Sequence, residues 1–177
     1  STTNGNDRWP DFLARRLQAD PTKSHIAVLN QGIGGGAVVS GGLGPTAIQR
    51  FQRDVLEQRG VRWVIVLEGV NDLGGAGDAG IAQRLIDAYQ SFIDQAHARG
   101  LLVFGVPILP FAGNNPYDNA LRQTARQTVN TWNRTSGQFD AVIDLAATVA
   151  DPNNANQLLG AYDTGDRSLY TFLHWEE

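Results

Sequence analysis

The sequence predicts an α/β fold in which helices pack on both faces of a parallel sheet. Four short runs are almost continuously apolar and rich in β-branched residues, as expected for strands covered on both faces. These runs cover residues 25–30, 61–67, 101–108 and 141–145. Stretches with helical spacing of apolar residues separate them, and this alternation is typical of parallel strands joined by helices. We therefore expect three layers, α/β/α.

Four helices are expected between and before the strands. The helical spacing of apolar residues places them at residues 11–19, 45–58, 81–99 and 116–135. Pro10 suits a first helical turn, and Gly60 and Gly100 follow the second and third helices as stop signals. No internal repeat, linker or shift in composition marks a second unit. We expect one domain over residues 1–177.

The composition excludes several classes of protein. Apolar residues make up 42% of the chain and charged residues 18%, which is typical of a globular protein. A net charge of −4 without a run of Lys or Arg argues against a nucleic-acid partner. The longest apolar runs are too short to span a membrane. There is no cysteine, and no His, Asp and Glu cluster has ligand spacing, so we expect neither a metal nor another cofactor.

The first strand ends in a glycine-rich segment, "LNQGIGGGAV" at 29–38. Gly34, Gly35 and Gly36 present backbone N–H groups without a Cβ, and such donors can bind an anion or a developing oxyanion. A flexible turn is the alternative. Binding of a dinucleotide is disfavoured because further loop residues, "SGGLGP", separate the glycines from the next helix.

The second strand ends in Gly69-Val70-Asn71-Asp72. The Asn71 carboxamide is a neutral donor that can bind a negative oxygen, although Asn and Asp also favour turns and helix caps. The carboxyl ends of parallel strands meet at one edge of a sheet. Backbone N–H groups near Gly35 and the Asn71 amide are therefore expected to converge on one oxygen, which is the geometry that acyl transfer needs.

These motifs resemble those of the SGNH, or GDSL-type, serine esterases and lipases. "VLNQGIGGGAV" (28–38) and "VIVLEGVNDLG" (64–74) are similar to the second and third sequence blocks of that family, and residues 97–111 and 129–166 resemble its later regions. The resemblance implies a flavodoxin-like parallel sheet and a secreted enzyme. It also implies hydrolysis of small acyl esters, acetyl or short-chain, on a carbohydrate or lipid-like substrate.

The resemblance also implies roles for particular residues. Gly35 would donate its backbone N–H, and Asn71 its side-chain amide, to the oxyanion hole. Their neighbours would contact the substrate; these are Gly34, Gly36 and Asp72. In the family, the serine of a Gly-Asp-Ser block attacks the ester, and an Asp-x-x-His pair activates this serine.

The serine and the histidine do not follow the family pattern. No Gly-Asp-Ser block occurs in the sequence. Asp166 matches the acid, but Leu169 stands three residues later where the base is expected. His174 could act as the base if the tail folds back. Structural roles are expected for His25 and His97.

The resemblance further implies that residues 1–177 lack the family's first strand and last helix. In the family, that strand lies between the strands matched by 25–30 and 61–67. Its omission leaves two unpaired edges, and buried unpaired backbone groups are costly. We expect a strand from residues outside 1–177, direct pairing of the two flanking strands, or a strand from another chain.

The alternative function is a catalytically inactive domain that binds carbohydrate in the same cleft. Exposed aromatic side chains near the cleft would favour it, because they stack on sugar rings. The candidates are Trp9, Tyr117 and Tyr162.

Overall fold

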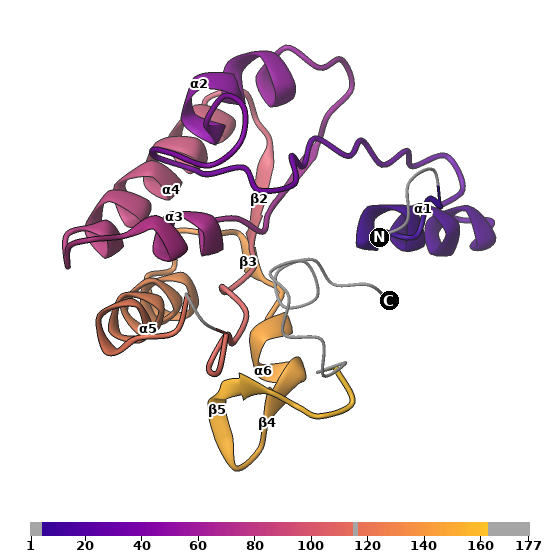
Figure 1. Ribbon diagram of the computed structural model, residues 1–177. Coiled ribbons are helices and arrows are strands. Elements are labelled where there is room, and N and C mark those ends of the chain that lie inside the picture. The colour runs from indigo at the N-terminus through magenta and orange to yellow at the C-terminus, as the bar shows by residue number, and fades with distance from the viewer. Residues whose placement is uncertain (1–4, 115–116, 163–177) are drawn as a thin grey trace.

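The computed structural model describes residues 5–114 and 117–162 (Figure 1). It contains a parallel sheet with the strand order β1-β2-β3. The strands are β1 (Trp63–Val66), β2 (Leu102–Gly105) and β3 (Ala141–Val142). Trp63 pairs with Leu102, and Phe104 pairs with Ala141. A separate antiparallel pair consists of β4 (Ala150–Asp151) and β5 (Asn154–Leu158). The predicted α/β class with a parallel sheet is confirmed.

The four expected helices are also confirmed. They are α1 (Trp9–Ala19), α2 (Ala47–Phe51) with its π-helical continuation η1 (Gln52–Leu56), α4 (Ile81–His97) and α5 (Ala120–Thr135). Two short helices are added, α3 (Val70–Gly75) and α6 (Leu145–Val149). Thr46 and Asn119 cap α2 and α5 by accepting a backbone N–H. Within the described ranges, no helix is both long and apolar enough to cross a bilayer.

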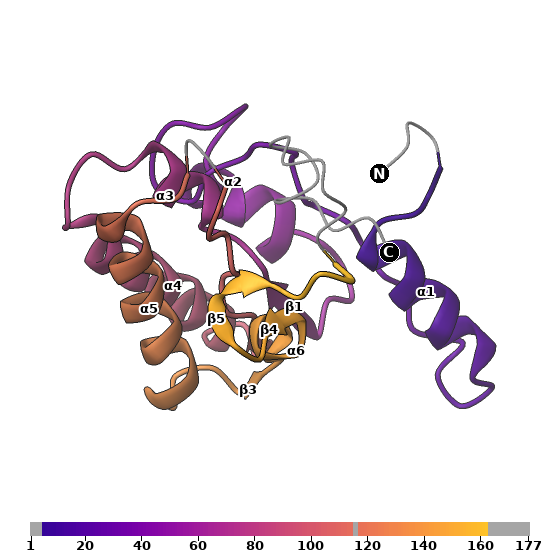
Figure 2. The ribbon, with the colours of Figure 1, turned by 60° about the horizontal axis from the view of Figure 1, so that its bottom comes forward.

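The core lies between the sheet and the helices α4 and α5, which run side by side in both views (Figures 1 and 2). Helix α4 buries one apolar face, which includes Leu85, Phe92 and Ile93, against the sheet. Val103 of β2 and Val129 of α5 are fully buried there. This packing fixes the sheet and thereby positions the loops that leave the carboxyl ends of its strands.

A groove borders β1 and is lined by residues of α1, α2 and η1 and by Phe92 of α4. Of its lining residues, Trp63 is 46% exposed and Ile143 is 43% exposed. Helix α1 stands apart from the other helices in Figure 2 and closes the far side of the groove with Leu13 and Leu17. The groove has a volume of about 790 Å³. The groove therefore separates α1 from β1, and the helix layer packed on the sheet is the one that contains α4.

His25 lies in a turn and residues 26–30 form no strand, so the prediction of a strand over 25–30 is wrong. The physical reason is the lack of a neighbour, because in the described part of the chain β1 pairs with β2 alone. Direct pairing between 25–30 and β1 is thereby excluded. The other two sources of a bridging strand remain predictions.

The free edge of β1 points into the groove. The carbonyls of Arg62 and Val66 accept backbone bonds from Leu102 and Val106 on the β2 side. Backbone groups alternate in direction along a strand, so those of Trp63, Ile65 and Leu67 point the other way. These residues and the extended segment 26–32 line the same groove.

Candidate active site

The glycine-rich segment forms a folded loop between the extended segment and α2. The Gly36 N–H donates to the Ile33 carbonyl at 2.8 Å, and the Leu43 N–H donates to the Gly35 carbonyl at 2.8 Å. Gly35 has a φ of +73°, a conformation that favours glycine. Among residues 5–114 and 117–162, the Gly35 N–H has no acceptor. It is therefore available to a ligand oxygen.

Asp72 ties this loop to α3. Its carboxylate accepts the N–H groups of Val38 and Val39, each at 2.8 Å, and the residue is only 3% exposed. Burial raises the pKa of Asp72, while the backbone donors oppose that rise. This geometry gives Asp72 an anchoring role, and its contact with substrate remains a prediction.

Asn71 lies directly beside the glycine loop. Its Nδ2 donates to the Gly36 carbonyl at 2.7 Å, and its Oδ1 accepts from the Tyr117 hydroxyl at 3.0 Å. These two bonds fix the carboxamide plane at both ends. The second Nδ2 proton has no acceptor among the residues that the structure describes, so the amide retains one donor for a ligand.

Tyr117 is the residue whose role the sequence did not reveal. It is 8% exposed, and burial raises the pKa of its hydroxyl, so the group stays a proton donor at neutral pH. The prediction that Tyr117 could be an exposed ring that stacks on sugars is wrong, because the ring is buried against Gly74. Trp9 is 36% exposed, and Tyr162 packs partly buried against the core.

Replacing Gly74 by alanine is expected to displace Tyr117. A Cβ at Gly74 would lie 2.0 Å from the Tyr117 Cε1, which is too close for two carbon atoms that are not bonded. We expect a loss of about 1–3 kcal/mol in unfolding free energy, measured by urea denaturation. Gly75→Ala is the matched control in the same helix, since a Cβ there meets nothing within 4 Å. Equal stability of the two variants would contradict this packing.

Neither described histidine is hydrogen-bonded to Asn71 or to the glycine loop within the described residues. His97 Nε2 is 2.8 Å from Asp140 Oδ2, and Asp140 also accepts the Val103 N–H at 2.7 Å. This contact joins the end of α4 to the amino ends of β2 and β3, as a structural role requires. His25 is exposed at the groove. Asp166 and His174 lie outside the described residues, and within these no His, Asp and Glu cluster could hold a metal ion.

A second polar cluster surrounds Arg50 on α2. The side chain contacts Asp54, Glu68 and the Gln31 carbonyl. Burial raises the pKa of Glu68 to about 7, an effect that Arg50 partly opposes. No motif in the sequence predicts this cluster, because its members come from three separate segments, with Arg50 and Asp54 on the same continuous helix.

Two comparisons bear on the family. A search of curated proteins found no match. The model of the GDSL-like Lipase/Acylhydrolase family matches residues 1–176, which is nearly the entire chain. This match agrees with the glycine loop and with the Asn71 amide beside it. The chain belongs to the GDSL-like lipase and acylhydrolase family, and the hydrolysis of esters is the general activity that this membership supports.

Proposed function

We propose that the protein hydrolyses small acyl esters, acetyl or short-chain, on a carbohydrate or lipid-like alcohol, with a serine as nucleophile. The observation that carries the proposal is the Asn71 carboxamide, held against the Gly36 carbonyl with one proton left free. The Gly35 N–H, in the glycine loop beside Asn71, is the second free donor. Two such donors are what a tetrahedral intermediate of acyl transfer requires.

In this mechanism the serine hydroxyl attacks the ester carbonyl, and its proton passes through a histidine to the leaving alcohol. The carbonyl oxygen becomes negative and accepts from Gly35 and Asn71. The Tyr117 hydroxyl donates to the Asn71 Oδ1, which polarises the amide and strengthens its remaining donor. Water then releases the acid from the serine. Asp166 orients the histidine, for which His174 is the candidate.

The serine is proposed to arrive on a strand that pairs with the free edge of β1. This arrangement is supported by the unpaired backbone groups of Trp63, Ile65 and Leu67 beside the groove. A strand there would run toward the carboxyl end of β1, where Asn71 follows.

The inactive carbohydrate-binding domain is the weaker candidate. It requires exposed aromatic rings at the cleft. Tyr117 is turned inward and bonded to Asn71, while Trp9 is exposed and lines the groove beside β1. Secretion, which the family resemblance implies, is part of the proposal.

Hydrolysis of p-nitrophenyl acetate, with and without a serine-directed phosphonate, tests the proposed function. We expect turnover that the phosphonate abolishes, together with a covalent adduct in the intact mass. Peptide mapping of the adduct then identifies the serine. Protein that shows neither turnover nor adduct, yet is retained on xylan or pectin, would replace the proposal by binding alone.

A further inference from the structure

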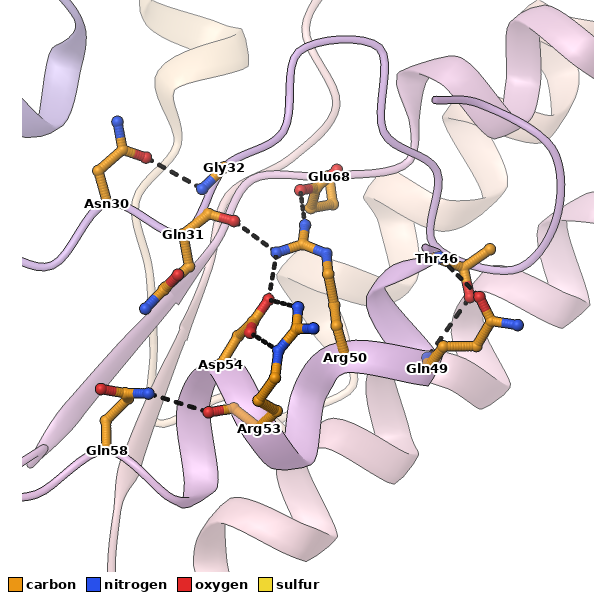
Figure 3. A network of polar contacts seen from close by, with 10 residues as sticks. All are labelled: Asn30, Gln31, Gly32, Thr46, Gln49, Arg50, Arg53, Asp54, Gln58 and Glu68. Carbon is orange, nitrogen blue, oxygen red and sulfur yellow. Dashed lines mark hydrogen bonds and ion pairs between the residues drawn. The ribbon is translucent and has the colours of Figure 1, made fainter. Parts of the chain in front are cut away.

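Arg50 occupies an enclosed position between two segments of the candidate site (Figure 3). The residue is only 7% exposed. Its Nη1 donates to the Gln31 carbonyl and lies 3.3 Å from Asp54 Oδ2, while its Nη2 lies 3.4 Å from Glu68 Oε1. One guanidinium therefore contacts a backbone carbonyl and two carboxylates from separate parts of the chain.

Two of these contacts lie on the segments that carry the oxyanion donors. Gln31 directly precedes the glycine loop that contains Gly35. Glu68 directly precedes Gly69, the residue that caps α3 and leads to Asn71. The Tyr89 hydroxyl, which is deeply buried, donates to the Glu68 carbonyl at 2.7 Å and holds this second segment against α4.

We propose that Arg50 is a positioning residue that sets the separation between the Gly35 peptide and the Asn71 amide, acting through Gln31 and Glu68. The inference rests on the ester-hydrolase function proposed above. The Asn71–Gly36 bond joins the same two segments closer to the donors. The two connections together hold the glycine loop and the start of α3 as one unit.

A guanidinium suits this role better than an ammonium. Its planar fork offers several donors in fixed directions, so it can bond to a carbonyl and to carboxylates on either side at once. A lysine at this position would keep the charge but would not reach the Gln31 carbonyl and Glu68 together. The identity of the side chain is therefore expected to matter, beyond its charge.

Glu68 makes this contact sensitive to pH. Burial raises its pKa to about 7, so that the carboxylate gains a proton just below neutrality and its attraction to Arg50 weakens. The groups that act on Glu68 are Arg50 from α2, which lowers its pKa, and Asp72 from α3, which raises it. Tyr89 from α4 contacts its carbonyl, and Asp54 from η1 shares the Arg50 guanidinium.

The test records ¹H–¹⁵N NMR signals of the Gly35 amide and the Asn71 side-chain amide in Arg50→Gln and Arg50→Lys. We expect both signals to move in Arg50→Gln, and to move less in Arg50→Lys, which keeps the charge. Where turnover is measured, kcat falls about tenfold to a hundredfold in Arg50→Gln while KM changes little, as expected from misplaced donors. Unchanged signals in a folded Arg50→Gln protein would overturn the inference.

Arg134→Gln is the matched control. Arg134 forms a two-bond ion pair with Asp144, at 2.7 and 2.9 Å, that touches neither donor segment. Its loss is expected to leave both signals and kcat unaltered. A structural effect common to any lost ion pair would instead move the signals in both variants, and this result would also refute a specific role for Arg50.

If Arg50→Gln does not fold, Glu68→Gln provides a second test. The Gly35 signal of the unaltered protein is expected to titrate with a midpoint near pH 7, and Glu68→Gln is expected to abolish that titration. A Gly35 signal that does not titrate, or that still titrates in Glu68→Gln, would contradict the inference. A protein without esterase activity would refute the proposed function. The NMR signals do not depend on turnover, so they would still decide whether Arg50 positions Gly35 and Asn71.

Discussion

Replacing Asn71 by alanine is expected to lower kcat for p-nitrophenyl acetate by about a hundredfold to a thousandfold, with KM nearly unchanged. The side-chain amide would bind the developing oxyanion more strongly than the neutral ester carbonyl, so its loss would raise the barrier without weakening ground-state binding. Asn71→Ala also removes the acceptor of the Tyr117 hydroxyl, which lies 3.0 Å from Asn71 Oδ1.

Steady-state kinetics of three variants check this expectation. Asn71→Asp keeps the shape of the side chain but replaces its donor by a negative group, so it is expected to be at least as impaired as Asn71→Ala. Asn153→Ala, an exposed asparagine in the β4–β5 turn, is the control and should retain full activity. An Asn71→Ala variant with a kcat within about twofold of the unaltered protein would remove Asn71 from the oxyanion hole.

Asp72→Ala is expected to lower the free energy of unfolding by about 1–3 kcal/mol or more, because it leaves one buried and one part-buried N–H group without an acceptor, and a buried one costs about 1–3 kcal/mol. These are the N–H groups of Val38 and Val39, and Val38 is fully buried. Since the same bonds hold the glycine loop against α3, the variant should also lose the ordered position of Gly35. Loss of stability and loss of activity are therefore expected together.

Urea denaturation measures the stability change, with Asp87→Ala as the control. Asp87 is exposed on α4, and its side chain accepts a hydrogen bond from Gln83 at 2.8 Å, so its replacement is expected to change stability by no more than about 0.5 kcal/mol. A similarly small change in Asp72→Ala would show that the carboxylate does not anchor the loop.

The sequence predicted the helices well because their signals are local. The apolar spacing of residues 81–99 and the stop at Gly100 correspond to α4, which ends at His97. A strand depends on a neighbour that can be far away in the chain. Residues 25–30 have the composition of a strand but find no partner in the described part of the protein, and they form no strand.

The candidate site was predictable only in part for the same reason. Gly35 and Asn71 could be named because short motifs surround each of them. The Tyr117 hydroxyl reaches Asn71 across 46 residues of sequence, and Arg50 reaches Glu68 across 18. Neither contact has a local pattern. For Tyr117 the sequence suggested an exposed ring, whereas the ring is buried, because the sequence alone cannot indicate that Gly74 leaves room for it.

A crystal structure of the protein treated with a serine-directed phosphonate would locate the oxyanion hole, because the phosphoryl oxygen marks the position of the oxyanion. We expect this oxygen to lie about 2.7–3.1 Å from both the Gly35 nitrogen and the Asn71 Nδ2. A phosphoryl oxygen bound by other donors, with the Gly35 N–H and the Asn71 amide directed away from it, would show that these two groups do not form the oxyanion hole.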